Sequence, residues 1–138
     1  MPPRAAPPPE PTRRPVALPA VPLGPRVLSV LGLSYRARRP VLLEGPTGIG
    51  KSEIVRAAAE QLGIGLAVLD LSLLEPPDLV GLPIIEQGRT RYALPSILPQ
   101  DGAGILLLEE LNRAERYIQQ PALQLLTART LHEYRLPE

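Results

Sequence analysis

One short segment limits most strongly the folds open to this chain. Gly45 to Ser52 reads GPTGIGKS, which fits the pattern GxxxxGK[ST], and it follows the apolar run Val41 to Leu43 directly. Continuous apolar runs are typical of strands buried on both faces of a parallel sheet. From Lys51 to Leu62 the apolar residues recur at helical spacing, and Gly63 is a plausible stop. A buried strand, a glycine-rich loop and a helix in that order predict α/β architecture.

Two more apolar runs predict two more buried strands. They are Leu66 to Leu71 and Ile105 to Leu108. Between them, prolines and glycines exclude a long helix. Within that stretch, Ile84 to Leu94 has extended-type residues on either side of Gln87 and Gly88, so we expect a hairpin there.

Helical spacing marks one segment on each side of these strands. Arg26 to Leu33 is short and apolar, and we expect it to pack beside the core. A last helix is expected between Ala114 and Ala128, with Pro121 either in its first turn or kinking it.

Residues 1–25 carry ten of the nineteen prolines and no apolar periodicity, so we predict a disordered or polyproline-like arm before a partial domain over residues 26–138. Up to Pro40 there are seven arginines and a single acid, but arginine prevails throughout the chain. This favours a compositional bias over a tether for nucleic acid or membrane. No export signal or spanning run is recognisable and cysteine is absent, so a cytoplasmic protein without disulfides is expected.

The glycine-rich loop has the composition of a phosphate cradle. Its glycines let successive N–H groups point into one concavity, and the following helix adds its positive dipole end. Lys51 is the single lysine beside fourteen arginines, and a planar guanidinium does not easily replace a compact ammonium in such a cradle. The competing interpretation is a tight turn that merely opens a helix. We expect triphosphate binding by Gly45, Pro46, Thr47, Gly48, Ile49, Gly50, Lys51 and Ser52.

Two acids follow the third predicted strand. Glu109 and Glu110 would lie at the carboxyl edge of the sheet, where open α/β folds bind ligands. There the first acid, with the Ser52 hydroxyl, can hold Mg²⁺, and the second can accept a proton from attacking water. A strand that ends in acids is by itself usually a chain leaving the core, but the preceding phosphate loop favours a functional role. An acid placed to activate water disfavours a small-molecule kinase, and nothing distinguishes ATP from GTP.

The segments GPTGIGKS and ILLLEELNRA resemble the Walker A and Walker B motifs of AAA+ ATPases. More narrowly, residues 110–114 (ELNRA), residues 78–83 (DLVGLP) and the hairpin segment resemble the MoxR-like, dynein-related (AAA_5-type) branch. The resemblance runs from Arg38 to the last residue. It implies a P-loop NTPase three-layer sandwich and a hydrolase that converts ATP to ADP and phosphate with Mg²⁺. It also implies chaperone-like remodelling of an unidentified protein partner, usually by a hexameric ring, without a role for membrane or nucleic acid.

The same resemblance assigns roles to single residues. It implies catalytic roles for Lys51 and Glu110 and metal binding by Ser52, whereas Glu109 replaces the aspartate usual in the family, so its fit to the metal is open. Asn112 and Arg113 would lie near a neighbouring subunit, and a trans-acting Arg113 competes with a solvated arginine before the helix. Tyr92 in the hairpin is a candidate for a substrate-facing loop, but we expect its ring to pack against neighbouring residues. His132 has no second metal-ligand type around it, so we expect a structural role for it.

In the family the strand order is 5-1-4-3-2, and this chain supplies candidates for strands 1, 2 and 3 only. Strand 4, strand 5, the γ-phosphate sensor, the arginine finger and the helical lid would follow Glu138. We therefore expect a fragment of a longer protein, with weak nucleotide binding and impaired turnover in isolation. A nucleotide-binding switch or scaffold with little hydrolysis remains the alternative to an ATPase.

Overall fold

The computed structural model describes residues 19–137. Of the arm predicted for residues 1–25, residues 1–18 lie outside the described residues. Residues 19–24 have no regular secondary structure, and Pro25 already begins α1. In chain order the elements are α1 (Pro25–Arg36), α2 (Lys51–Leu62), β1 (Gly65–Asp70), a 3₁₀ turn (Leu71–Leu73), α3 (Pro76–Val80), β2 (Leu82–Glu86), β3 (Arg89–Ala93), β4 (Gly104–Glu109), α4 (Arg116–Ala128), β5 (Thr130–Leu131) and β6 (Tyr134–Arg135).

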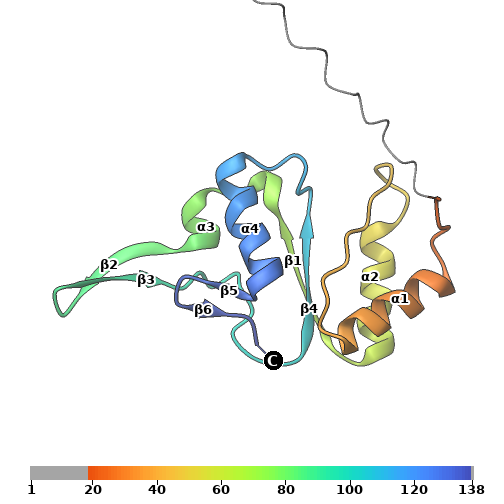
Figure 1. The fold of residues 1–138 in the computed structure, drawn as a ribbon, viewed down its shortest axis with the longest axis horizontal. Coiled ribbons are helices and arrows are strands. Elements are labelled where there is room, and N and C mark those ends of the chain that lie inside the picture. The colour runs from red at the N-terminus through yellow and green to blue at the C-terminus, as the bar shows by residue number, and fades with distance from the viewer. Residues whose placement is uncertain (1–18, 138) are drawn as a thin grey trace, which may run out of the picture.

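A parallel pair of strands forms the centre of the fold. β1 and β4 run in register from Gly65 beside Gly104 to Asp70 beside Glu109. Helices α1 and α2 lie on one side of this pair and α3 and α4 on the other (Figure 1). Within β4, Ile105 and Leu107 pack toward α1 and α2, while Leu106 and Leu108 pack toward α4. β4 is therefore covered on two faces, whereas Val68 of β1 is 42% exposed. The expected incomplete three-layer α/β arrangement is confirmed.

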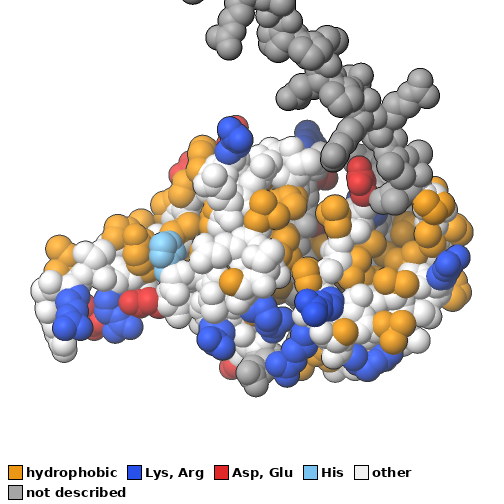
Figure 2. All heavy atoms as spheres, in the orientation of Figure 1, with side chains coloured by type: hydrophobic (Ala, Val, Ile, Leu, Met, Phe, Trp, Pro, Cys, Tyr) orange, Lys and Arg blue, Asp and Glu red, His pale blue; other side chains and the backbone are white. Residues whose placement is uncertain are grey.

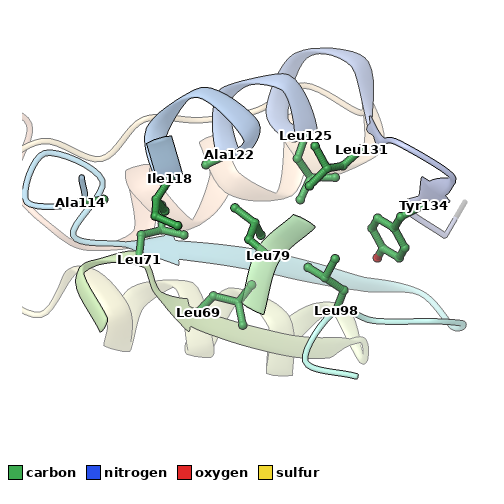
Figure 3. Packing of buried hydrophobic residues seen from close by; sticks show 10 residues of the cluster. All are labelled: Leu69, Leu71, Leu79, Leu98, Ala114, Ile118, Ala122, Leu125, Leu131 and Tyr134. Carbon is green, nitrogen blue, oxygen red and sulfur yellow. The ribbon is translucent and has the colours of Figure 1, made fainter. Parts of the chain in front are cut away.

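The larger core cluster lies between the sheet and α4 (Figure 3). Ile118, Ala122 and Leu125 have no exposed surface. They stand at spacings of three and four residues, which places them on one face of the helix. Opposite them lie side chains from β1, from the 3₁₀ turn, from α3 and from the segment before β4, namely Leu69, Leu71, Leu79 and Leu98. This packing fixes α4, and with it the segment that leads from β4 into α4.

Replacing Ile118 by alanine should lower the free energy of unfolding by about 2–5 kcal/mol, because it leaves a cavity at a fully buried site. The same truncation of Leu123, which lies on α4 with 48% exposure, should change the free energy by roughly 0.5 kcal/mol or less. Urea unfolding of the two variants measures both values. Equal destabilisation by both would contradict this description of the core.

The strand predicted for Val41 to Leu43 is wrong for the described residues, where this segment has no regular secondary structure. A strand needs a hydrogen-bonded neighbour, and β4 pairs with β1 alone. Leu42 is accordingly 76% exposed. Leu43 still packs against the α1 and α2 cluster, so the segment leads into the glycine-rich loop beside the sheet without joining it.

The predicted hairpin is confirmed as the antiparallel pair β2 and β3. Its two turn residues, Gln87 and Gly88, have φ of 52° and 75°. Positive φ at both central residues is the signature of turns whose twist matches the flanking strands. The hairpin extends as an arm away from the layered body (Figure 1), and hydrophobic side chains lie along it (Figure 2). Among these, Ile85 is 84% exposed.

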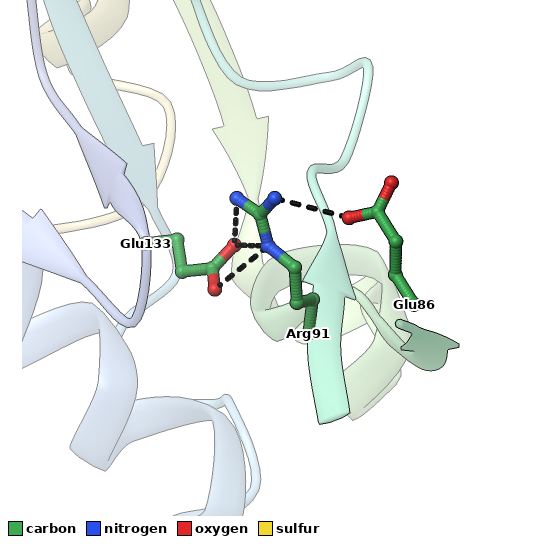
Figure 4. Close-up of polar contacts among 3 residues, drawn as sticks. All are labelled: Glu86, Arg91 and Glu133. Carbon is green, nitrogen blue, oxygen red and sulfur yellow. Dashed lines mark hydrogen bonds and ion pairs between the residues drawn. The ribbon is translucent and has the colours of Figure 1, made fainter. Parts of the chain in front are cut away.

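A second hairpin, β5 and β6, was not expected, and it contacts the first. The Arg91 guanidinium binds both carboxylate oxygens of Glu133 at 3.1–3.2 Å and one oxygen of Glu86 at 3.0 Å (Figure 4). The hydrogen bonds to Glu133 have the largest effect on the pKa of Arg91 and raise it above its ordinary value, and the hydrogen bond to Glu86 raises it further. Tyr92 and His132 stack with ring centroids 4.3 Å apart. These contacts join the two hairpins.

Helix α4 settles the alternatives for Pro121, which lies in the interior of the helix and not in its first turn. A short helix, α3, was also not expected. It starts with two prolines, and the N–H of Glu75 donates to Oδ2 of Asp78 at 2.9 Å, which caps it. None of the described helices has the length and apolar character needed to cross a membrane.

Candidate nucleotide-binding site

The glycine-rich loop approaches α2 through left-handed backbone conformations. Gly48 and Gly50 have φ of 79° and 94°. Glycine adopts this region without steric cost, whereas a residue with a Cβ is strained there. Gly50 is the N-cap residue of α2, so the loop turns directly into the first helical turn at Lys51.

The backbone N–H groups at the start of α2 are available to bind a ligand. No backbone carbonyl in the described residues accepts a hydrogen bond from the N–H groups of Thr47 to Ser52. The first N–H groups of any helix lack intrahelical partners and carry the positive end of the helix dipole. A left-handed loop that precedes such a helix start is therefore suited to bind an anion with several oxygen atoms.

The Lys51 ammonium lies over the loop. Its Nζ donates to the carbonyl oxygens of Gly45 at 2.9 Å and Pro46 at 2.7 Å. A lysine ammonium has three N–H donors, so one remains beyond these two bonds. The only lysine of the chain is thus held at the loop by the backbone of the loop itself.

The loop and the acid-ended strand meet at one hydrogen bond. The Ser52 hydroxyl donates to Oε1 of Glu109, across 57 positions of the sequence. The contact joins the first turn of α2 to the carboxyl end of β4 and brings together the two residues predicted as metal ligands. Asp70 ends the neighbouring strand, but its carboxylate accepts from the Ser72 N–H and hydroxyl. In the described residues no three Asp, Glu or His side chains cluster as a metal site would require.

Glu110 has an unusual backbone conformation, with φ of 55°. Its carbonyl accepts the N–H groups of Arg113 at 2.9 Å and Ala114 at 3.1 Å. Its Oε2 lies 3.6 Å from Nη1 of Arg113, which is an ion pair within one chain. Asn112, in the same turn, is exposed. The structure therefore gives Arg113 a partner in its own chain, and that partner is the predicted proton acceptor.

Tyr92 and His132 are not brought to the loop. They contact each other where the two hairpins meet, and the ring of Tyr92 is partly buried there. Sequence reasoning missed Gln119, which donates two hydrogen bonds to the turn after Glu110. No sequence signal distinguishes this glutamine from Gln120 beside it.

Comparisons with known proteins agree on one family. A protein-family model for AAA domains of the dynein-related subfamily matches residues 40–137. Protein MoxR of Paracoccus denitrificans is 35% identical over 120 residues, which are 81% of this chain and 35% of that protein. Protein MoxR of Methylorubrum extorquens is 29% identical over 119 residues, with the same shares. Midasin of Giardia intestinalis is 36% identical over 88 residues, which are 62% of this chain and 2% of that protein.

The chain thus spans about a third of the length of the MoxR relatives. The family model covers well over half of the chain, and the matched range contains both the loop and the acid-ended strand. The chain belongs to the AAA+ ATPases, as a MoxR-like member of their dynein-related subfamily.

Proposed function

We propose that residues 45–52 bind ATP with Mg²⁺ and that the intact protein hydrolyses ATP. The observation that carries this proposal is the hydrogen bond from Ser52 to Glu109. It joins the end of the glycine-rich loop to a carboxylate at the carboxyl end of β4. That combination has no evident structural purpose, because both side chains lie at the edge of the fold where parallel strands end.

Binding rests on the loop and on Lys51. The unpaired N–H groups of Thr47 to Ser52 would donate to phosphate oxygens, and the dipole of α2 would favour their negative charge. The ammonium of Lys51 would exchange its bonds to the Gly45 and Pro46 carbonyls for bonds to the β- and γ-phosphates. Both carbonyls are exposed, so water can replace the ammonium when it moves.

The residues present fit a bound Mg²⁺. An oxygen from Ser52 and one from Glu109 already lie in contact, and magnesium in such sites is held by one or two carboxylates together with phosphate oxygens and water. The longer side chain of Glu109, compared with aspartate, reaches the serine hydroxyl from β4. The chemistry that the metal supplies when bound is neutralisation of charge on the phosphate oxygens.

Glu110 is the proposed general base. Its carboxylate would accept a proton from a water molecule whose oxygen attacks the γ-phosphorus, while the bond from that phosphorus to the β–γ bridging oxygen breaks. The products are ADP and phosphate. Glu110 is one-third exposed, so water has access to it.

We further propose that the intact protein assembles into a hexameric ring and uses hydrolysis to remodel a protein partner. Support comes from its membership of the family and from the resemblance to MoxR and midasin proteins. The hairpin arm of β2 and β3 would be available to such a partner, since it extends from the body with Ile85 exposed.

A second candidate function is a nucleotide-dependent switch or scaffold with little hydrolysis. Two observations are compatible with little hydrolysis: position 109 has a glutamate where the family usually has an aspartate, and Lys51 is hydrogen-bonded to its own loop. Such a protein would bind ATP and change partners without turnover. Turnover of a Glu110→Gln variant separates the two candidates.

Replacing Ser52 by alanine should remove most of the benefit of Mg²⁺ for ATP binding, because one metal ligand is lost. Calorimetric titration of ATP with and without Mg²⁺ measures that benefit, and the variant should lose roughly tenfold in affinity only when the metal is present. Ser96→Ala is a matched control, since Ser96 is exposed in the loop before β4. An unchanged metal dependence in Ser52→Ala would refute the proposed metal site.

A further inference from the structure

We propose that Gln119 is a positioning residue for hydrolysis, which sets the place of the Glu110 carboxylate through the turn of residues 110–114. The inference rests on the proposed function of Glu110. Gln119 itself touches neither of the two acids nor the glycine-rich loop in any of the hydrogen bonds present.

Gln119 lies in the first turn of α4 and reaches back along the chain. Its Nε2 donates to the carbonyl oxygen of Leu111 at 3.0 Å and to that of Ala114 at 2.9 Å. Long side chains on helices point toward the helix N-terminus, so this position is suited to bind a segment that precedes the helix. The neighbouring Ile118 is fully buried, which anchors the base of this side chain.

The contact requires a side chain with two hydrogen-bond donors. Both partners of the side chain are carbonyl oxygens, and the NH₂ group of glutamine has one N–H donor for each of them, whereas an ionised carboxylate of the same size has none. Neither carbonyl accepts a backbone N–H in the described loops and turns. Gln119 therefore supplies the hydrogen bonds that these two partly buried carbonyls would otherwise lack.

These two bonds fix the turn that carries Glu110. Leu111 and Ala114 are packed into the core cluster, while Glu110 and Arg113 extend toward solvent from the same turn. The left-handed backbone of Glu110 is unfavourable for a residue with a Cβ, and it persists only where the surroundings hold it. Gln119 holds both carbonyls of the turn from the rigid side of α4. A shift of about 1 Å in a group that activates water can cost roughly 100-fold in rate.

The sharpest test replaces Gln119 by glutamate in the intact protein. The size stays the same, but an ionised carboxylate faces the two carbonyls with acceptors only. We expect kcat for ATP hydrolysis to fall roughly 10- to 100-fold, with the dissociation constant for Mg²⁺ and ATP unchanged. Gln120→Glu is the matched control, because it adds the same charge at an exposed neighbouring position and should keep wild-type kcat.

A pH profile adds a readout that general destabilisation would not move. A protonated carboxyl regains one donor, so the ratio of Gln119→Glu to wild-type kcat should rise as the pH falls toward about 5, near the ordinary range of a glutamate pKa. Methionine has a similar length but neither donors nor charge. Gln119→Met should therefore have a low kcat at every pH. If Gln119→Glu unfolds, the methionine variant alone decides the question.

Wild-type kcat in folded Gln119→Met or Gln119→Glu would overturn the inference. So would a loss of ATP binding in proportion to the loss of kcat, since that would indicate damage to the whole domain. Failure of the proposed function gives a different result: Glu110→Gln would then retain turnover, whatever the effect of Gln119.

Discussion

Replacing Glu110 by glutamine should reduce ATP hydrolysis by the intact protein roughly 10²- to 10⁴-fold. The amide has the size of the carboxylate but cannot accept a proton from the attacking water. ATP binding should persist, because the loop, Lys51 and Ser52 are unchanged. Phosphate release under saturating ATP, beside an equilibrium binding measurement, separates the two effects.

Glu60→Gln is the matched control for this experiment. It removes the same charge from an exposed position on α2, so ATP binding and ATP hydrolysis should both be unaffected. Turnover that stays at the wild-type level in Glu110→Gln would refute the hydrolytic role of Glu110. If wild-type turnover is itself negligible while ATP binds tightly, the switch or scaffold is the better description.

The ion pair between Arg113 and Glu110 bears on the interpretation of variants at this site. The family resemblance suggests that Arg113 acts on a neighbouring subunit, yet its guanidinium lies 3.6 Å from Glu110 of the same chain. Its side chain is 69% exposed, so the attraction is screened by water and worth little stability. Loss of Arg113 would therefore alter the surroundings of Glu110 as well as any contact between subunits, and its effect cannot be assigned to the neighbour alone.

Local signals predicted the helix that follows the loop and the first hairpin. Helix α2 begins at Lys51 and ends before Gly63, whose φ is 66°, because apolar periodicity and a glycine stop are both encoded nearby. The β2 and β3 hairpin was predicted for the same reason, since Gln87 and Gly88 carry the turn. Where the interactions that determine an element lie between residues close in sequence, the local sequence pattern is sufficient to predict that element.

The wrong or missing predictions concern segments whose structure depends on residues far away in the sequence. The run Val41 to Leu43 has the composition of a buried strand, but a strand also needs a partner, and β4 pairs only with β1. The β5 and β6 hairpin turns at His132 and Glu133, which are not turn-type residues. Its contacts with Arg91 are formed about 40 positions away and leave no local signal.

The candidate site divides in the same way. The loop and the acids were predicted from their residue types and their places beside strands. The contact between Ser52 and Glu109 depends on how α2 packs against β4, and the hydrogen bonds of Gln119 depend on where α4 starts. Tertiary packing fixes both, so a motif names the reacting groups but not what holds them in place.

Replacing Lys51 by alanine should weaken ATP binding roughly 10- to 100-fold, since a hydrogen bond to a charged group contributes about 1.5–3 kcal/mol. Lys51→Arg should not restore binding, because the planar guanidinium does not fit where the compact ammonium contacts the Gly45 and Pro46 carbonyls. That result would explain why an arginine-rich chain has lysine here.

Arg56→Ala is the control, because Arg56 is exposed on the same helix and its loss changes the net charge equally. Titration with a fluorescent ATP analogue compares the variants at one ionic strength.

The carbonyls freed in Lys51→Ala are exposed to water, so the melting temperature should stay unchanged and weaker binding would not reflect unfolding. Equal affinities for Lys51→Ala and Arg56→Ala would mean that the loop does not present Lys51 to a phosphate. The binding of a triphosphate by residues 45–52 would then have to rest on backbone N–H groups alone.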